Sequence, residues 1–168
     1  NGQRQAMFLE NASGLAEQIL RNFELSEKDT ALVISSSGCN RVPIEMAELF
    51  QKQGIKVVAL VSKLHSNASK TKDTRGKKLS DFADLILDTG APVGDAMIDI
   101  QGLDTPVSPG STLGGCLVIN SIKAEVAQRL TDAGQPPKVL TAGAVIGAER
   151  ATEIFQAAYD EHGRLLSR

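Results

Sequence analysis

Three consecutive serines, Ser35, Ser36 and Ser37, combine residue types and a position that suit binding chemistry. They follow an apolar run at residues 31–34, which has the length and composition of a strand buried on both faces of a parallel sheet. They precede Pro43, which fits the first turn of a helix because its missing N–H would have no partner there. The serines therefore lie where backbone N–H groups and the positive end of a helix dipole converge. This position predicts a site for a phosphate or carboxylate group.

The same serines also have a purely structural interpretation. Serine competes for backbone hydrogen bonds and is common in turns, so a serine run ending in Gly38 is ordinary loop chemistry as well. The anion site is favoured because ligands of open α/β sheets bind beyond the carboxyl ends of the strands.

A polar segment, residues 62–78, follows a second apolar run at Lys56–Val61. Segments of this length without regular structure are usually functional or mobile, and we expect most of its lysines to face water. If the segment folds over the serine turn, one or two of its cationic side chains and His65 would face a bound anion. A histidine placed there can titrate near neutrality and transfer protons.

Apolar spacing predicts the elements that position these loops. Strand, helix and strand around the serines form a βαβ unit, which should be right-handed. A helix with early Glu45 is expected to run from Pro43 to a cap at Gly54. Asp95, in a loop of glycine and proline, is interpreted as a turn residue, with a role in a site left open. Further elements are expected at residues 7–23 (a helix that restarts near Gly14), 79–83 (a helical turn), 85–87 and 96–100 (strands), and 148–166 (a helix).

A long helix is predicted to start within residues 107–115, with Ser111 or Thr112 as its N-cap. Gly114 and Gly115 fall in its first turn, where glycine weakens a helix. Another part of the protein or a ligand must therefore approach that backbone closely.

Composition limits the possible classes. With 168 residues the chain fits a single domain, residues 1–168. Charge is nearly balanced, with 18 basic and 20 acidic residues, so no nucleic-acid or membrane partner is expected. Cys39 and Cys116 are too few and too far apart for a disulfide framework, which fits the cytoplasm. No metal-ligand spacing and no nucleotide-binding loop occurs, so no metal and no cofactor are expected.

The sequence ISSSGCNRVPIEMA resembles the second phosphosugar loop of sugar isomerase (SIS) domains, whose pattern is Ser-x-Ser-Gly-x-Thr. The His-Ser pair after the next strand, GKKL, APVGDA and the helix started by Ser-Thr follow in order. Together they resemble bacterial SIS-domain proteins described as phosphoheptose or phosphosugar isomerases, from about Gly14 to the last helix. The resemblance implies an α/β, flavodoxin-like three-layer αβα sandwich with a mainly parallel sheet.

The resemblance also implies a ligand and an assembly. Ser35, Ser37 and Asn40 would surround the phosphate of a sugar, and family members are commonly dimers or tetramers with sites near subunit boundaries. We therefore expect a homodimer or homotetramer that binds a small sugar phosphate. The residues expected to bind it are Ser35, Ser36, Ser37, Gly38, Asn40, Ser62, Ser66, Ser111 and Thr112.

Three departures from the family pattern bear on activity. Asn40 stands where the family often has threonine. An earlier strand with its own ligand loop normally comes first, and no residue before Ala31 supplies it. Some isomerases carry a catalytic glutamate ahead of the Ser-Thr pair, but here Pro106 and Val107 occupy that place, with Asp104 the nearest acid.

An aldose–ketose isomerase moves a proton between adjacent carbons and needs a base and an acid. Glu45, expected in the first turn of its helix, is the candidate base, and His65 is the candidate acid or ring-opening residue. Glu45 has an alternative role as a carboxylate that stabilises the helix start. An isomerase of the phosphoheptose type is the favoured function. The alternatives are a non-catalytic phosphosugar sensor and a lyase that cleaves an ether-linked sugar phosphate.

Overall fold

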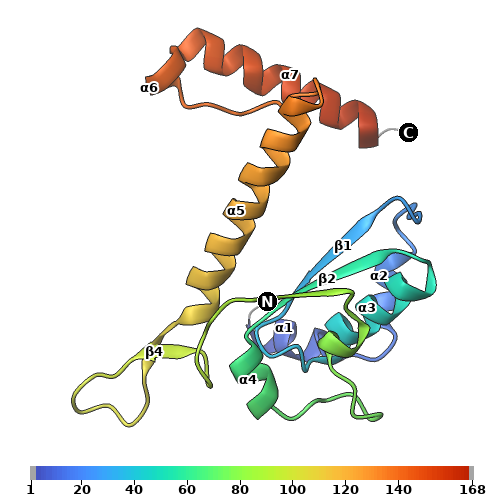
Figure 1. Cartoon of the computed structure of the whole chain (residues 1–168), viewed down its shortest axis with the longest axis vertical. Helices are drawn as coiled ribbons and strands as arrows, with labels where there is room; N and C mark the ends of the chain where they lie inside the picture. Colours follow the sequence, from blue (N-terminus) through green and yellow to red (C-terminus); the bar gives the residue numbers. More distant parts are fainter. Residues whose placement is uncertain (1–2, 167–168) are drawn as a thin grey trace. The chain divides into compact units, whose positions relative to one another are not determined.

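The computed structural model describes residues 3–166, with side chains from residue 4 to residue 163. The chain divides into two compact units, residues 1–120 and 121–168. The first unit holds α1 (Gln3–Leu9), α2 (Leu15–Leu20), β1 (Thr30–Ile34), α3 (Arg41–Lys52), β2 (Lys56–Val61), α4 (Lys63–Ala68), the 3₁₀-helix η1 (Leu79–Phe82), β3 (Leu85–Asp88), β4 (Ala96–Ile98) and β5 (Val107–Pro109) (Figure 1). The helix α5 (Gly110–Asp132) begins in the first unit, and α6 (Gly143–Ile146) and α7 (Ala148–Leu166) belong to the second.

The sheet of the first unit is parallel, in the order β1-β2-β3. Val33, Ala59 and Ile86 are aligned across it, and Val33 and Ala59 are buried in a core shared with Ile44 and Ala47 of α3. β-branched and small residues occupy the alternate positions of these strands that face α3, and this pattern favours strand formation. The α/β fold with a parallel sheet, as in flavodoxin-like SIS domains, is confirmed.

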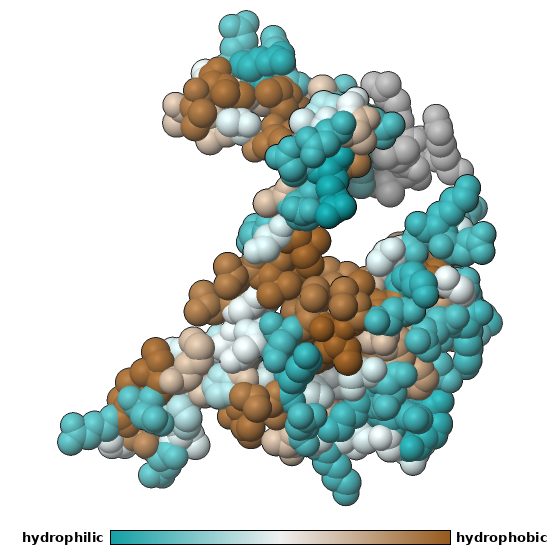
Figure 2. Space-filling model, viewed as in Figure 1, coloured by the Kyte–Doolittle hydropathy of each residue, from teal (hydrophilic) through white to brown (hydrophobic). Residues whose placement is uncertain are grey.

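The expectation that residues 31–34 are buried on both faces is wrong. Only alternate residues of β1 point toward α3, so Leu32 and Ile34 remain 42% and 57% exposed on the other face. Leu85 of β3 is exposed on the same face, because it aligns with Val58 and Val58 with Leu32. Figure 2 shows hydrophobic surface in the region of the sheet.

Two other expectations about local structure need correction. The polar segment 62–78 is not wholly a loop, because the helix α4 occupies residues 63–68. This helix lacks apolar periodicity, and a serine at its amino end caps it. The long helix α5 begins at Gly110, so Ser111 and Thr112 lie in its first turn rather than at its N-cap. The expected close approach is found at Gly114, where a Cβ would lie 2.0 Å from the carbonyl oxygen of Thr89, but not at Gly115, where a Cβ would meet no atom of the described residues within 4 Å.

The second unit is helical. None of residues 121–163 is buried, and Val139, Val145 and Phe155 are about half exposed or more. Its aromatic pair, Phe155 and Tyr159, stacks with ring centroids 4.4 Å apart. Across the described part of the chain, no helix has both the length and the apolar composition needed to cross a membrane.

Candidate functional site

The serine loop, residues 35–40, connects β1 to α3 at the carboxyl edge of the parallel sheet. Ser35 N–H donates to Leu60 O (3.1 Å), and Ser62 N–H donates to Ser36 O (2.9 Å). These bonds continue the pairing of β1 and β2 past the strand ends. The loop is therefore held against the start of α4.

Two of the three serines shape the loop. Ser35 Oγ accepts from Gly38 N–H and Ser37 Oγ accepts from Cys39 N–H, both at 3.2 Å. Ser36 differs, because its Oγ is buried and has no hydrogen-bond partner among the described residues. Burying a hydroxyl without a partner costs free energy, about 1–3 kcal/mol in proteins. Ser35 and Ser37 thus fit the structural interpretation, and Ser36 fits a ligand-binding one.

Residues 69–79, called the strap below, hold the serine loop from one side. Lys72 N–H donates to Cys39 O (2.9 Å), and Leu79 N–H donates to Gly38 O (2.8 Å). Both bonds fix carbonyl groups of the loop, and because peptide units are planar the orientation of the adjoining N–H groups is fixed as well.

The amino end of α3 keeps free donors. In a trans peptide the N–H points opposite to the C=O, so Asn40 N–H points away from the strap bond made by Cys39 O. Among the described residues neither Asn40 N–H nor Arg41 N–H has an acceptor, and the Asn40 side chain makes no cap bond. Val42 N–H is taken by Glu10 O (2.9 Å). Two adjacent N–H groups at a helix start can bind an anion.

The short helix α4 carries the other predicted polar residues. Ser62 Oγ accepts from His65 N–H (3.1 Å) and donates to Ala91 O (2.7 Å), so this buried hydroxyl is a cap. Ser66 is also buried. His65 Nδ1 accepts from Gly94 N–H (3.1 Å), which leaves the ring proton of the neutral imidazole on Nε2. In this form the His65 ring can donate a hydrogen bond through Nε2.

Glu45 lies elsewhere in its helix than the sequence predicted. Because α3 begins at Arg41, Glu45 is in the second turn, beyond the first turn in which a carboxylate stabilises a helix start most strongly. Its carboxylate accepts from Gly14 N–H (3.0 Å) and Ser13 Oγ (3.3 Å), which closes the amino end of α2. Any catalytic use of this carboxylate competes with those two bonds.

The start of α5 is closed by a side chain from the loop after β3. Asp95 Oδ1 accepts from Ser111 N–H (2.7 Å), and Asp95 Oδ2 accepts from Ser111 Oγ (2.6 Å). The sequence left open whether Asp95 is only a turn residue or has a role in a site. In the structure it caps a helix 16 residues further along the chain. Thr112, beside it, is exposed.

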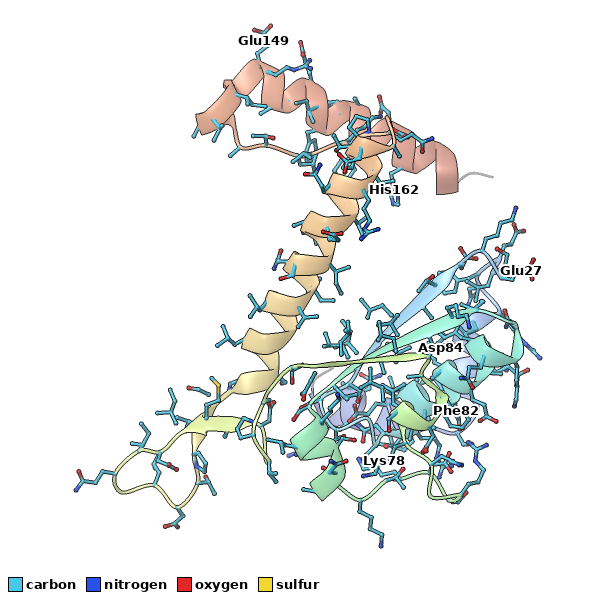
Figure 3. All side chains as sticks on the ribbon, viewed as in Figure 1. Glu27, Lys78, Phe82, Asp84, Glu149 and His162 are labelled. Carbon is cyan, nitrogen blue, oxygen red and sulfur yellow. The ribbon has the colours of Figure 1, made fainter. Side chains whose placement is uncertain are left out.

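An ion network that the sequence analysis missed anchors the strap to α3. Arg75 donates to both oxygens of Glu48 (3.1 and 2.9 Å) and to Asp73 (2.7 Å), and lies 5.8 Å from the ring centre of Phe82 (labelled in Figure 3). Hydrogen bonds from Arg75 lower the pKa of the Asp73 and Glu48 carboxyls, with Lys52 adding to the effect at Glu48. Glu48 and Arg75 are 27 residues apart, so no local spacing could have predicted the pair.

Asp88, at the carboxyl end of β3, organises the neighbouring loop. Its Oδ1 accepts from Gly90 N–H (3.0 Å) and Lys63 N–H (3.1 Å). The bond from Gly90, followed by that from Lys63, lowers the pKa of this carboxyl. Over the described residues no group of three or more histidine, cysteine, aspartate or glutamate side chains is arranged to hold a metal ion.

Comparisons with known proteins identify the family of this chain. A family profile described as SIS domain matches residues 1–62. UPF0309 protein lin2794 of Listeria innocua is 31% identical over 165 residues, which cover 98% of this chain and 67% of that protein. The chain belongs to the UPF0309 family of SIS-domain proteins. Another relative in this family, UPF0309 protein BH3325 of Halalkalibacterium halodurans, is 35% identical over 145 residues, 86% of this chain and 60% of the relative.

A UPF0309 protein of Brucella anthropi is 35% identical over 142 residues, 84% of this chain and 57% of the relative. The chain thus spans about two thirds of the length of these UPF0309 relatives or less. Membership in the SIS domain family points to a function related to sugar phosphates.

Proposed function

We propose that the serine loop binds the phosphoryl group of a small phosphorylated sugar. The observation that carries this proposal is that, among the described residues, the buried Ser36 hydroxyl has no partner and the N–H groups of Asn40 and Arg41, at the end of the same loop, have no acceptor. A phosphoryl group offers acceptor oxygens and negative charge, which suit these donors and the positive end of α3. The hydroxyl hydrogens of Ser35 and Ser37 add donors, because both oxygens act only as acceptors within the loop.

The activity we propose is aldose–ketose isomerisation of the phosphoheptose isomerase type. His65, with its proton on Nε2, would act as acid or ring-opening residue, and Glu45 would act as base. Ser62, Ser66, Ser111 and Thr112 stay in the proposed ligand set, although Ser62 and Ser111 already have protein partners. A non-catalytic phosphosugar sensor and a lyase acting on an ether-linked sugar phosphate remain the competing functions.

A homodimer or homotetramer is the assembly we propose for the cytoplasmic protein. The helix α5 supports it, because Leu113 and Val126 are 65% and 48% exposed, and side chains of this kind are usually covered in an assembly. Light scattering of the purified chain tests the assembly, and a monomer at all concentrations would contradict it.

Thermal unfolding with a panel of phosphorylated sugars tests binding. A ligand present at a hundred times its dissociation constant adds about 2.7 kcal/mol of stability. We expect sugar phosphates to raise the unfolding temperature and their unphosphorylated counterparts to leave it unchanged. If no phosphorylated sugar stabilises the fold, the proposal fails.

The Glu45→Gln variant tests catalysis. We expect loss of turnover of the best-binding sugar phosphate, with its affinity retained, because the amide keeps the shape but cannot take a proton. Product analysis by NMR distinguishes an isomerase from a lyase and from a sensor. Turnover at the wild-type rate in this variant would remove Glu45 from the mechanism.

A further inference from the structure

The strap contains a buried charge, and the proposed chemistry does not use it. Asp73 is 9% exposed, and its side chain accepts from Arg75 N–H (2.6 Å), Nε (3.1 Å) and Nη2 (2.7 Å). Taking a carboxylate out of water is costly unless it is fully hydrogen-bonded. Asp73 therefore fixes the Arg75 guanidinium in one orientation.

Arg75 uses that orientation to reach another element. The same guanidinium forms a two-pronged pair with Glu48 in the middle of α3, a geometry that arginine provides and lysine does not. The Glu48 side chain is 19% exposed, so this pair is shielded from solvent on the side of the carboxylate. The middle of the strap is thus bound to the helix whose amino end forms the anion site.

The part of the strap before this attachment contacts the serine loop directly. Lys72, just before Asp73, donates its N–H to Cys39 O and accepts from Arg41 Nη2 (3.2 Å). Cys39 Sγ also lies 3.8 Å from Ser69 O, although its nearer acceptor is Ser37 O at 3.3 Å. The bond at Cys39 O sets the direction of the next N–H, that of Asn40, which is one of the two free donors.

We propose that Arg75 is a positioning residue for the anion site: by binding Asp73 and Glu48 it holds the strap against Cys39, and so keeps Asn40 N–H aimed at the phosphoryl group. This inference rests on the proposed function, because it names what prepares that site. Arg75 touches no part of the serine loop itself among the bonds described, so its effect passes through Lys72.

The test compares three variants, each in a Cys116→Ser background. Arg75→Gln removes the charge, and Arg75→Lys keeps the charge but not the two-pronged geometry. Lys56→Gln is the matched control, because it removes an ion pair with Asp84 (2.9 Å) at the amino end of β2, away from the loop. Urea unfolding establishes how much stability each variant loses.

The first readout needs no ligand. Cys39 is 3% exposed beneath the strap, so its rate of reaction with a thiol reagent reports lifting of the strap. We expect faster labelling in Arg75→Gln, partial recovery in Arg75→Lys and the wild-type rate in Lys56→Gln. Unchanged labelling in Arg75→Gln overturns the inference.

The second readout is the affinity for inorganic phosphate and fructose 6-phosphate, with the amide shift of Asn40 followed by NMR. Changes away from a binding site alter affinity by roughly 2- to 30-fold, and we expect a loss of this size in Arg75→Gln and none in Lys56→Gln. Faster labelling with unchanged affinity overturns the positioning role. If the wild type binds neither compound, the proposed function fails. The labelling experiment needs no ligand, so it distinguishes this failure from a failure of the inference about Arg75.

Discussion

The amino ends of α3 and α5 solve the same physical problem in opposite ways. Every helix start leaves backbone N–H groups without partners inside the helix. At α5 the Asp95 carboxylate accepts from both the N–H and the hydroxyl of Ser111. At α3 the N-cap Asn40 makes no such bond.

The difference teaches how to distinguish a structural helix start from a binding one. A carboxylate supplied by the protein neutralises the positive end of α5 and leaves little for an external anion. Among the described residues no carboxylate caps α3 in this way, and the Ser36 hydroxyl in the preceding loop is buried without a partner. The open helix start is the better candidate for a ligand.

Gly38→Ala should have the largest effect, because Gly38 lies in the serine loop that leads to the uncapped amino end of α3. Gly38 has φ of 61°, and an added Cβ would lie 3.2 Å from Leu79 Cβ. We expect a loss of about 2–3 kcal/mol in urea unfolding, from left-handed strain plus crowding, together with weaker binding of sugar phosphates.

Gly54→Ala is the control for that loss. Gly54 has φ of 75°, but its Cβ would meet no atom closer than 3.9 Å, and it lies before the amino end of β2. We expect about 1 kcal/mol and unchanged affinity. Equal effects of the two substitutions would contradict the special role of Gly38.

Asp95→Asn should remove the charged cap at the amino end of α5. Asparagine tolerates the left-handed backbone of Asp95 (φ 68°) but lacks the negative charge, so we expect a loss of about 1.5 kcal/mol in urea unfolding. Ser111→Ala, which removes only the hydroxyl bond, should cost less. Because Ser111 belongs to the proposed ligand set, sugar-phosphate affinity should fall in Ser111→Ala, and unchanged affinity would remove Ser111 from that set.

Ser36→Ala should separate stability from binding. It removes a buried hydroxyl that has no partner, so we expect unchanged or slightly higher stability of the free protein. Phosphate affinity, measured by calorimetry, should fall roughly fivefold, or ~1 kcal/mol. Lower stability with unchanged affinity would show that the hydroxyl serves the fold.

Lowering the pH should have the smallest effect, and it should act on the ion pairs that attach the strap to α3. Arg75 holds the pKa of Asp73 and Glu48 below their ordinary values of 3.8 and 4.5. This contribution to stability is therefore complete above those ordinary values and disappears as the pH falls through the lowered ones. The stability difference between wild type and Arg75→Gln should be constant from pH 7 to about pH 5 and shrink below about pH 4. A difference that grows in acid would contradict the network.

Most elements of the fold could be predicted, because local patterns determine them. Lys56–Val61 and Ala148–Leu166 carry their apolar periodicity within one segment, and both were predicted with the bounds observed. The helix α4 was missed because six mostly polar residues show no such period, and a cap at Ser62 forms it instead.

The site was harder to predict, because its groups are defined by partners far along the chain. The serines and the helix after them identified the loop, but only the structure shows which of the three serine hydroxyls, that of Ser36, has no partner among the described residues. The partners of Glu45 are 31 and 32 residues away, and Ser111 is 16 residues from Asp95. Side-chain spacing carries no information on such contacts.

The free donor at Asn40 belongs to the main chain, and this has a consequence for sequence divergence. Exchanging the side chain at position 40 leaves the amide in place, and proline is the one residue that deletes it. Related chains can therefore carry different side chains there, which would change the sugar that fits beside the proposed phosphoryl group, and still keep the amide. A search for the substrate should accordingly vary the carbohydrate and keep the phosphate.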